Sequence, residues 1–400
     1  MKILVVCQFY YPEPFRIHEI TSSMVRRGHS VTVITTYPNY PEGKIYDGYS
    51  NDGTKKELKD GVVIYRIYSR PRMKGSLNLG LSFIDFYKKA NKFVRNFKDS
   101  FDIVYSYQLS PVMQVIPAYK YARRNNIPLY VYCLDIWPDS ILDVFPSQKS
   151  IFYKLVKWWS RSIYSKADMI GVTSVSFKDY LINKLGLRNI PIEYRPQHSD
   201  DVKGNENFDK HTDGCDIFFM GNIGESQNFD MIIDAVKLVR HIDTFKLHIV
   251  GEGSMYNHTV ERVQQEGLGD KIVFYGRRPY SEMPQFYKMA DACLLTLTNK
   301  SSIGMTVPGK LQNYMAAGKP IIASIGGDST MVIEAAHCGI VAIPDDSTAL
   351  ANAFVEFINN KDKYSICGNN ARKYYLANYT LDKHIDRLEE DLLYLVRSKA

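Results

Sequence analysis

Residues 304–322, GMTVPGKLQNYMAAGKPII, combine a glycine-containing loop with a short helix. The preceding run ADACLLTL (290–297) is apolar and predicts a strand, and the polar residues that follow it predict a loop. Pro308 suits the first position of a helix, and Gly318 with Pro320 ends that helix. Strand, loop and helix together form one βα unit of a parallel sheet.

The amino end of this helix has the features of an anion site. Backbone N–H groups and the positive end of the helix dipole favour negative charge there, and Lys310 adds a full positive charge. Gly304 and Gly309 allow the backbone to approach a phosphate closely, and loop hydroxyls such as that of Thr306 can donate hydrogen bonds. A diphosphate is the natural occupant. The alternative is a helix capped only for stability, which leaves the first-turn lysine without a role.

The βα rhythm recurs along both halves of the chain. In the first half, short apolar runs alternate with helical patterns at residues 2–7, 30–36, 62–68, 102–108, 128–135 and 167–174. In the second half, such runs lie at 216–222, 245–251, 271–276, 290–297, 319–324 and 339–343. Buried runs separated by helices are typical of parallel sheets. We therefore expect an α/β fold with two Rossmann-like doubly wound domains facing across a cleft.

Length and polarity predict where these domains divide. The chain has 400 residues, more than one hydrophobic core usually organises. We expect an N-terminal acceptor domain at 1–195, a polar linker at 196–214 and a C-terminal donor domain at 215–379. The last residues, about 380–400, predict an amphipathic helix that could pack back onto the first domain.

Positive charge is concentrated in the first half. Residues 1–200 contain 29 Lys and Arg against 17 Asp and Glu, whereas the whole chain has a formal charge of +7. Within this half, residues 82–98 and 149–166 interleave aromatic and basic side chains, as helices at membrane interfaces do. We expect an anionic membrane surface, and no nucleic acid, as a partner. The alternative is that each stretch is an ordinary amphipathic helix whose aromatic stripe belongs to the core.

Other features bear on location and cofactors. No segment resembles a signal peptide, and no apolar run approaches the roughly 18 residues of a membrane span. The sequence predicts a cytoplasmic protein, peripheral at the inner face of the plasma membrane. The six cysteines are widely spaced, which favours packing as small apolar residues. Neither an Asp-x-Asp motif nor a Cys/His cluster is present, so we expect no metal and no other cofactor.

Several stretches match one family in order and spacing. The chain resembles glycosyltransferase family 4, which has the GT-B fold, and especially bacterial enzymes of capsule, exopolysaccharide and O-antigen assembly. The matching stretches are FYYPEP (9–14), RRGHSVTVIT (26–35), TYPNYPEGKIYDGY (36–49), LDIWPDS (134–140), FMGNIGESQNFD (219–230), IVGEG (249–253), FYGRRPYSEMPQFYKMADA (274–292) and VPGKLQNYMAAGKPII (307–322). The stretch GNIGESQN resembles the fucosamine-transferase-like subgroup.

The resemblance implies a UDP-sugar site on the C-terminal domain. The implied donor-binding residues are Gly221, Asn222, Gln227, Gly251, Glu252, Gly253, Arg277, Arg278, Gly304, Met305, Thr306, Val307, Pro308, Gly309, Lys310 and Asn313. Met305 and Asn313 stand where the family commonly has glutamates, and Asn222 and Gln227 stand where it has an Arg and a Lys. With two cations missing near a diphosphate, Lys310 carries more of the charge stabilisation and is expected to act in catalysis.

On the acceptor side, five residues lie at or just beyond the ends of expected strands: Tyr10, Phe15, Arg16, Tyr107 and Asp135. We predict that the first four bind the acceptor. Asp135 is the predicted catalytic residue, since it could orient or deprotonate the acceptor hydroxyl. A capping role in the turn into IWPDS is the alternative for Asp135, and a plain surface position is the alternative for Arg16.

These features predict a retaining glycosyltransferase that moves a hexose or N-acetylamino sugar from a UDP-sugar to a lipid-linked saccharide of the undecaprenyl-diphosphate type, in cell-surface polysaccharide biosynthesis. Retention is implied by the family alone. One alternative is a sugar-nucleotide epimerase of the same architecture. A second is a non-catalytic sugar-nucleotide-binding paralogue, which the four departures from the family pattern motivate.

Overall fold

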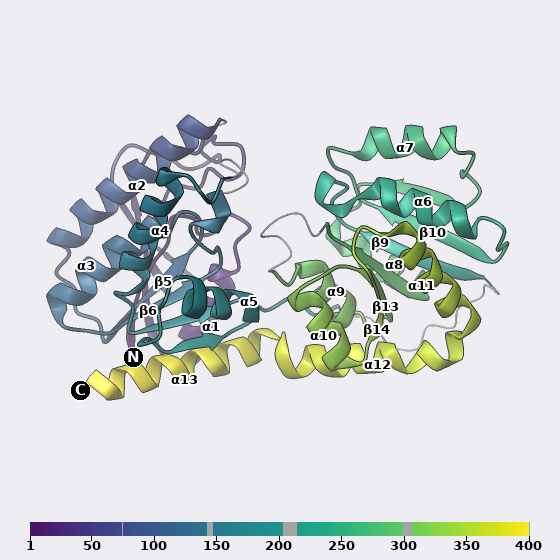
Figure 1. Ribbon diagram of the computed structural model, residues 1–400. Helices are drawn as coiled ribbons and strands as arrows, with labels where there is room; N and C mark the ends of the chain where they lie inside the picture. Colours follow the sequence, from purple (N-terminus) through teal and green to yellow (C-terminus); the bar gives the residue numbers. More distant parts are fainter. Residues whose placement is uncertain (74, 142–146, 203–213, 299–305, 400) are drawn as a thin grey trace. The chain divides into compact units, whose positions relative to one another are not determined.

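The computed structural model describes residues 1–73, 75–141, 147–202, 214–298 and 306–399 (Figure 1). The chain divides into two compact units, the first formed by Met1–Pro196 with His384–Ala400 and the second by Gln197–Lys383. The division lies one residue from the expected domain limit at 195. Apart from Pro196, the described part of the expected linker belongs to the second unit, where Val202 is buried in the hydrophobic core.

The first unit is built on a sheet with the strand order β3-β4-β2-β1-β5-β6-β7-β8. Its strands are β1 (Lys2–Val6), β2 (Ser30–Thr36), β3 (Lys55–Lys59), β4 (Val62–Ile67), β5 (Ile103–Gln108), β6 (Leu129–Cys133), β7 (Met169–Val172) and β8 (Ile192–Tyr194). Its helices include α1 (Ile17–Arg26), α2 (Ser76–Asn96), α3 (Val115–Asn125), α4 (Ile151–Tyr164) and α5 (Val175–Asp179). Neighbouring strands are parallel except β3 and β4. The winding reverses between β1 and β5, and this switch point opens a crevice at their carboxyl ends.

The second unit has a parallel sheet with the order β11-β10-β9-β12-β13-β14. Its strands are β9 (Cys215–Met220), β10 (Phe245–Val250), β11 (Ile272–Gly276), β12 (Ala292–Thr296), β13 (Ile321–Ser324) and β14 (Gly339–Ala342). Its helices include α6 (Phe229–Val239), α7 (Tyr256–Gln265), α8 (Met283–Met289), α9 (Gly309–Ala316), α10 (Asp328–Ala336), α11 (Ser347–Asn359) and α12 (Lys361–Asn378). The winding reverses between β9 and β12.

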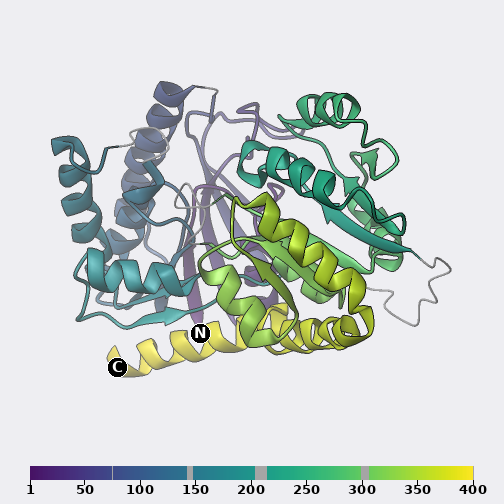
Figure 2. The same ribbon diagram turned by 45° about the vertical axis from the view of Figure 1, so that its right-hand side comes forward.

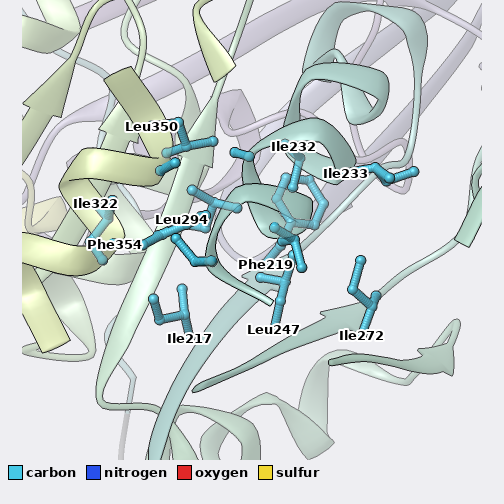
Figure 3. Packing of buried hydrophobic residues seen from close by; sticks show 14 of the residues in the cluster. Ile217, Phe219, Ile232, Ile233, Leu247, Ile272, Leu294, Ile322, Leu350 and Phe354 are labelled. Atoms are coloured by element: carbon cyan, nitrogen blue, oxygen red, sulfur yellow. The ribbon is translucent and has the colours of Figure 1, made fainter. Parts of the chain in front are cut away.

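Apolar side chains from both strands and helices hold this second sheet in place. Figure 3 shows Phe219, Leu247 and Leu294 from the strands packed with Ile232 of α6 and Phe354 of α11. All five are at most 1% exposed, so the strands are covered and fixed by the helices. Burial of this kind contributes roughly 1.5–3 kcal/mol to the stability of the fold for each large apolar side chain.

The last helix, α13 (Leu381–Lys399), packs on the first unit from His384 onward and runs past the amino end of the chain (Figure 2). Asp391 accepts hydrogen bonds from Arg195, with an NH2 to Oδ1 distance of 2.7 Å, and Glu389 lies 2.7 Å from His29 Nε2. The helix therefore packs back onto the first domain, which its amphipathic pattern allowed.

Two further expectations concern the core and the membrane. All six cysteines are buried thiols, which confirms that they pack as small apolar residues. Among the helices that the structure describes, none is long and apolar enough to cross a bilayer.

Candidate functional site

An open pocket of about 840 Å³ lies at the carboxyl ends of β9, β10 and β11 in the second unit. It brings together seven residues that the resemblance implied: Gly221, Asn222, Gly251, Glu252, Gly253, Arg277 and Arg278. The sequence reasoning missed its other lining residues, Val250, Ser254, Tyr256, Asn257 and Met283. Three of these directly follow the IVGEG stretch, so the loop after β10 was the signal that pointed to them.

Glycines allow the loops after these strands to approach one another closely enough to form backbone hydrogen bonds. The Gly251 N–H donates to the Gly276 carbonyl at 2.9 Å, and the Gly221 N–H donates to the Val250 carbonyl at 2.9 Å. Gly251 has a φ of +148°, and a Cβ at this position would lie 1.9 Å from the Gly221 carbonyl oxygen. Any larger residue at position 251 would force the loops apart, so this glycine shapes the pocket.

Two exposed arginines line the pocket, and in the part of the chain that the structure describes only one of them is held by a side-chain hydrogen bond. Arg278 donates from Nε to the Tyr275 carbonyl at 3.0 Å, which ties it to its own loop. Arg277 has no hydrogen bond or ion pair with any of the described residues. Glu252 adds an exposed carboxylate beside them. The pocket therefore offers a cation for a phosphate and a carboxylate for hydroxyl groups.

Lys310 lies at the switch point of the second sheet. Its Nζ is 4.0 Å from the centroid of the Phe219 ring and donates to the Asn222 carbonyl at 3.4 Å. A Cβ at position 221 would lie 2.3 Å from Lys310 Cε, so the glycine leaves room for the lysine side chain. Burial lowers the pKa of Lys310 from 10.5 to about 7. The structure thus places a partly desolvated cation beside the loop after β9.

The loop before α9 differs slightly from expectation. Pro308 is the N-cap, with an extended ψ of 143°, and the helix begins one residue later than predicted, at Gly309. Thr306 and Val307 precede it, and the Thr306 carbonyl accepts a hydrogen bond from Ser329 Oγ at 3.4 Å. The predicted site residues Gly304 and Met305 lie outside the described residues.

Two of the family departures have structural partners. Gln227 is 8% exposed, and its Oε1 accepts the Gly224 N–H at 3.0 Å, so it orders the loop after β9. The side-chain carbonyl of Gln227 therefore faces its own loop, and a donor contact for this residue stays a prediction. Asn313 on α9 accepts a hydrogen bond from Ser199 Oγ at 2.5 Å. Its Nδ2 has no partner in the described part of the chain and can donate to a ligand.

On the acceptor side, Tyr10 and Tyr107 are 0% and 1% exposed. The Tyr10 hydroxyl lies 2.6 Å from Thr21 Oγ1, and Tyr107 packs on the Tyr132 ring. Burial raises the pKa of both phenols. The prediction that these two residues contact an acceptor is not supported by their placement, because strand-end positions in a parallel sheet can face the core.

Arg16 and Glu19 form an ion pair of 3.1 Å on the first turn of α1, where both side chains are partly exposed. This agrees with the alternative of a surface arginine. An acceptor contact for Arg16 stays a prediction.

Phe15 and Asp135 line a second pocket, of about 500 Å³, in the first unit. Asp135 Oδ2 accepts the Ser110 N–H at 2.9 Å, so the carboxylate joins the loops after β5 and β6, which differs from the expected alternative of a cap on the turn into IWPDS. Oδ1 has no hydrogen-bond partner among the residues that the structure describes. One oxygen is therefore anchored while the other can accept a proton or a hydrogen bond.

Helices α2 and α4 expose apolar side chains together with basic ones. On α4, Tyr153, Ile163 and Tyr164 are buried, whereas the exposed large apolar residues are Ile151, Phe152, Leu155 and Trp158. On α2, Leu77, Leu81 and Ile84 are exposed at helical spacing. On each helix, some of the apolar side chains belong to the core, as expected for an ordinary amphipathic helix. Other apolar side chains of the same helix face outward.

No group of three or more His, Cys, Asp or Glu side chains that could hold a metal ion occurs in the described ranges. The expectation that the protein uses no metal stays a prediction.

Two family models match the two halves of the chain. The model "Glycosyltransferase Family 4" matches residues 15–197, and the model "Glycosyl transferases group 1" matches residues 205–374. The chain is a family 4 glycosyltransferase. One matched range falls in each unit, so the glycosyltransferase likeness extends over both units.

Individual relatives agree with this assignment. The chain is 25% identical to the putative colanic acid biosynthesis glycosyl transferase WcaI of Escherichia coli K12, over 80% of this chain and 82% of the relative. It is 22% identical to the O-antigen chain mannosyltransferase C of Escherichia coli, over the full length of both. The crystal structure of Anabaena HepE in complex with UDP superposes with a TM-score of 0.67 at 14% identity, over 99% of this chain and 100% of that one. The fold of this glycosyltransferase is GT-B.

Proposed function

We propose that this glycosyltransferase moves a hexose or an N-acetylamino sugar from a UDP-sugar to a lipid-linked saccharide in cell-surface polysaccharide biosynthesis, with retention of anomeric configuration. The donor side rests on one observation, the Lys310 ammonium at the switch point beside the 840 Å³ pocket. The similarity to WcaI and to an O-antigen mannosyltransferase supports polysaccharide assembly. The UDP bound by the structurally similar HepE supports the choice of nucleotide.

The donor nucleoside occupies the pocket after β9 to β11, whose volume is typical of small-molecule sites. Glu252 accepts hydrogen bonds from the ribose hydroxyls, and Arg277 attracts phosphate charge. The diphosphate extends toward the amino end of α9. There its negative charge raises the pKa of Lys310 back above 7, so that the bound lysine is protonated. A protonated lysine in a partly dry position stabilises the leaving diphosphate strongly.

Asp135 acts on the acceptor. The Ser110 N–H fixes one oxygen of its carboxylate, and the other oxygen accepts the hydrogen of the acceptor hydroxyl. The same side chain therefore has a positioning contact and a chemical role. Retention of configuration follows from front-face attack, which the family resemblance implies.

The membrane side rests on α4 and α2. The side chains of Phe152, Leu155 and Trp158 are 52%, 60% and 68% exposed on one face of α4, with Lys154 exposed beside them. Apolar groups insert into the interfacial region of a bilayer, and lysines are attracted to anionic headgroups. A peripheral position on the inner leaflet would bring the enzyme to a lipid-linked acceptor.

The test uses purified full-length protein, a panel of radiolabelled UDP-sugars and GDP-sugars, and a bacterial membrane lipid extract. Label from one UDP-sugar should move into the organic phase, and Lys310→Ala should abolish this transfer. Lys246→Ala is the matched control, because Lys246 is exposed at the amino end of β10, away from the pocket. Transfer from a GDP-sugar alone would overturn the UDP assignment. A change of the donor sugar without any acceptor would indicate an epimerase instead.

A further inference from the structure

The 500 Å³ pocket of the first unit is lined mainly by apolar side chains and lies at the switch point of its sheet. Its residues come from the loops after β1, β2, β4, β5 and β6 and from helices α2 and α4. We infer that this pocket binds the phosphate-proximal part of the acceptor's lipid chain, while the remainder of the chain stays in the bilayer. This inference rests on the proposed lipid-linked acceptor and names the part of that acceptor that the first unit recognises.

One wall of the pocket is a cluster of three aromatic rings, in which Phe15 stacks on Phe9 and meets Tyr40 edge to face. The Phe9 and Phe15 rings are stacked with centroids 5.3 Å apart, and the Phe15 and Tyr40 centroids are 4.9 Å apart. Phe9 is 4% exposed, so the inner end of the wall is dry. A rigid aromatic surface of this kind gives an unsaturated hydrocarbon chain a large apolar contact area.

The opposite wall connects the pocket to the outward-facing apolar stripes. Gly80 and Phe83 of α2 and Phe152 of α4 line the pocket. Leu77 on α2 and Leu155 on α4 belong to the same helices and are 83% and 60% exposed. Apolar surface therefore runs from the outside of the two helices into the pocket. A hydrocarbon chain can enter from a bilayer along this surface without crossing water.

The polar groups of the pocket match the head of such a lipid. The Arg72 guanidinium lies 4.9 Å over the Tyr40 ring. The backbone N–H of Arg72 donates to Asn39 Oδ1 at 2.7 Å, which fixes the main chain at this residue. No carboxylate pairs with Arg72 in the described part of the chain, so its charge is available for a phosphate. Asp135 supplies the only carboxylate among the pocket-lining residues and serves the reacting hydroxyl. An apolar chain, a phosphate and a sugar hydroxyl are the three parts of a lipid-linked saccharide.

Gly80 provides a clean way to close the pocket. A Cβ built on Gly80 meets nothing within 4 Å, so a larger side chain can extend into the space without a backbone clash. Replacing a helical glycine also favours the helix. Gly80→Leu should therefore fill the pocket and leave the fold intact, and Gly80→Ala is the matched control that leaves the pocket largely open.

The binding experiment uses calorimetry on the full chain with geranyl diphosphate below its micelle concentration, in the presence of saturating UDP so that the diphosphate site beside Lys310 is occupied. The wild type should bind it saturably, and inorganic diphosphate should bind at least tenfold more weakly. Gly80→Leu should weaken geranyl diphosphate binding at least tenfold, Gly80→Ala less than threefold, and Arg72→Gln about tenfold. UDP affinity should stay unchanged in all three variants, because the donor pocket lies in the other unit, and thermal unfolding like that of the wild type will show that the first unit folds. Equal binding of geranyl diphosphate by Gly80→Leu, or equal binding of inorganic diphosphate by the wild type, would overturn the inference.

Two further variants separate the pocket from the membrane surface and from the transfer reaction. Leu155→Glu should reduce binding to anionic vesicles but keep geranyl diphosphate binding, whereas Gly80→Leu should do the reverse. If the wild type labels a lipid extract and Gly80→Leu does so equally well, the transfer function stands and the lipid pocket is wrong. If binding depends on Gly80 but no lipid is ever labelled, the pocket stands and the proposed transfer is wrong.

Discussion

The Lys310 ammonium lies 4.0 Å from the centre of the Phe219 ring. Phe219 belongs to β9 and Lys310 to the helix that follows β12, so the contact joins the two strands between which the chain reverses its winding. A contact between a cation and an aromatic ring contributes about 0.5–2 kcal/mol. A charge-assisted hydrogen bond contributes about 1.5–3 kcal/mol, so a diphosphate is expected to draw the lysine away from the ring.

The first prediction is that Lys310→Ala weakens UDP binding by about 10- to 100-fold, because one charge-assisted contact to the diphosphate is lost. Calorimetric titration with UDP measures this directly. Uridine, which has no phosphate, should bind the variant and the wild type equally. The control Lys246→Ala should leave UDP affinity unchanged. If Lys310→Ala binds UDP like the wild type, the diphosphate does not lie at α9.

The second prediction is a dependence of UDP affinity on pH. Burial lowers the pKa of Lys310 to about 7 in the free protein, so the lysine is increasingly neutral above pH 7. Binding then requires uptake of a proton, and the dissociation constant should rise with pH, approaching about tenfold per pH unit above 7. Titrations at pH 7, 8 and 9 check the slope. The phosphates of UDP are already ionised in this range, so Lys310→Ala should show a flat profile. A flat profile in the wild type would contradict the proposed role of the burial.

The sequence predicted the fold better than it predicted the site. Apolar runs between helical patterns predicted both sheets, because buried parallel strands leave a strong period in the sequence. The glycines at 221 and 251 were also found, since close backbone contact tolerates no side chain. The burial of Tyr10 and Tyr107 was not predicted, because the direction in which a strand-end side chain points is set by tertiary packing.

The lipid pocket had a different reason for escaping the sequence analysis. Its walls come from residues far apart in the chain, such as Phe15, Gly80, Asp135 and Val156, and the segments of Gly80 and Val156 show no sign of a pocket. Phe15 and Asp135 were noticed because they follow strands. The contacts of Tyr40 with Phe15 and Arg72 bring together the loops after β1, β2 and β4. No local sequence pattern predicts that these loops lie side by side.

The third prediction concerns the glycine contact at the donor pocket. Gly251→Ala places a Cβ 1.9 Å from the Gly221 carbonyl oxygen, at a φ of +148° that an L-residue rarely adopts. We expect a loss of about 1–3 kcal/mol in the free energy of unfolding and weaker UDP binding. Denaturant unfolding and UDP titration measure the two effects. Gly269→Ala is the control, because a Cβ there meets nothing within 4 Å and should change neither quantity.

The fourth prediction is that α4 mediates membrane association. Leu155→Glu and Trp158→Glu remove exposed apolar side chains and add negative charge, so each should reduce sedimentation with anionic vesicles severalfold. High salt should release the wild type, since headgroup attraction is screened. Leu238→Glu, on α6 of the second unit and 51% exposed in the wild type, is the matched control and should sediment normally. Salt-insensitive sedimentation of all four proteins would contradict an interfacial role for α4.

The fifth prediction separates the two roles of Asp135. Asp135→Asn keeps a side-chain oxygen that can accept the Ser110 N–H, so the thermal stability should remain close to that of the wild type. The amide cannot accept the acceptor proton, and the rate of sugar transfer should fall about 100-fold or more. Asp135→Ala loses the Ser110 contact as well and should also lose about 1–3 kcal/mol of stability, because a backbone N–H is left unpaired. UDP affinity should be unchanged in both variants, since the donor pocket lies in the other unit. A wild-type transfer rate in Asp135→Asn would leave Asp135 with the loop contact alone, and the proton acceptor would then have to be sought elsewhere.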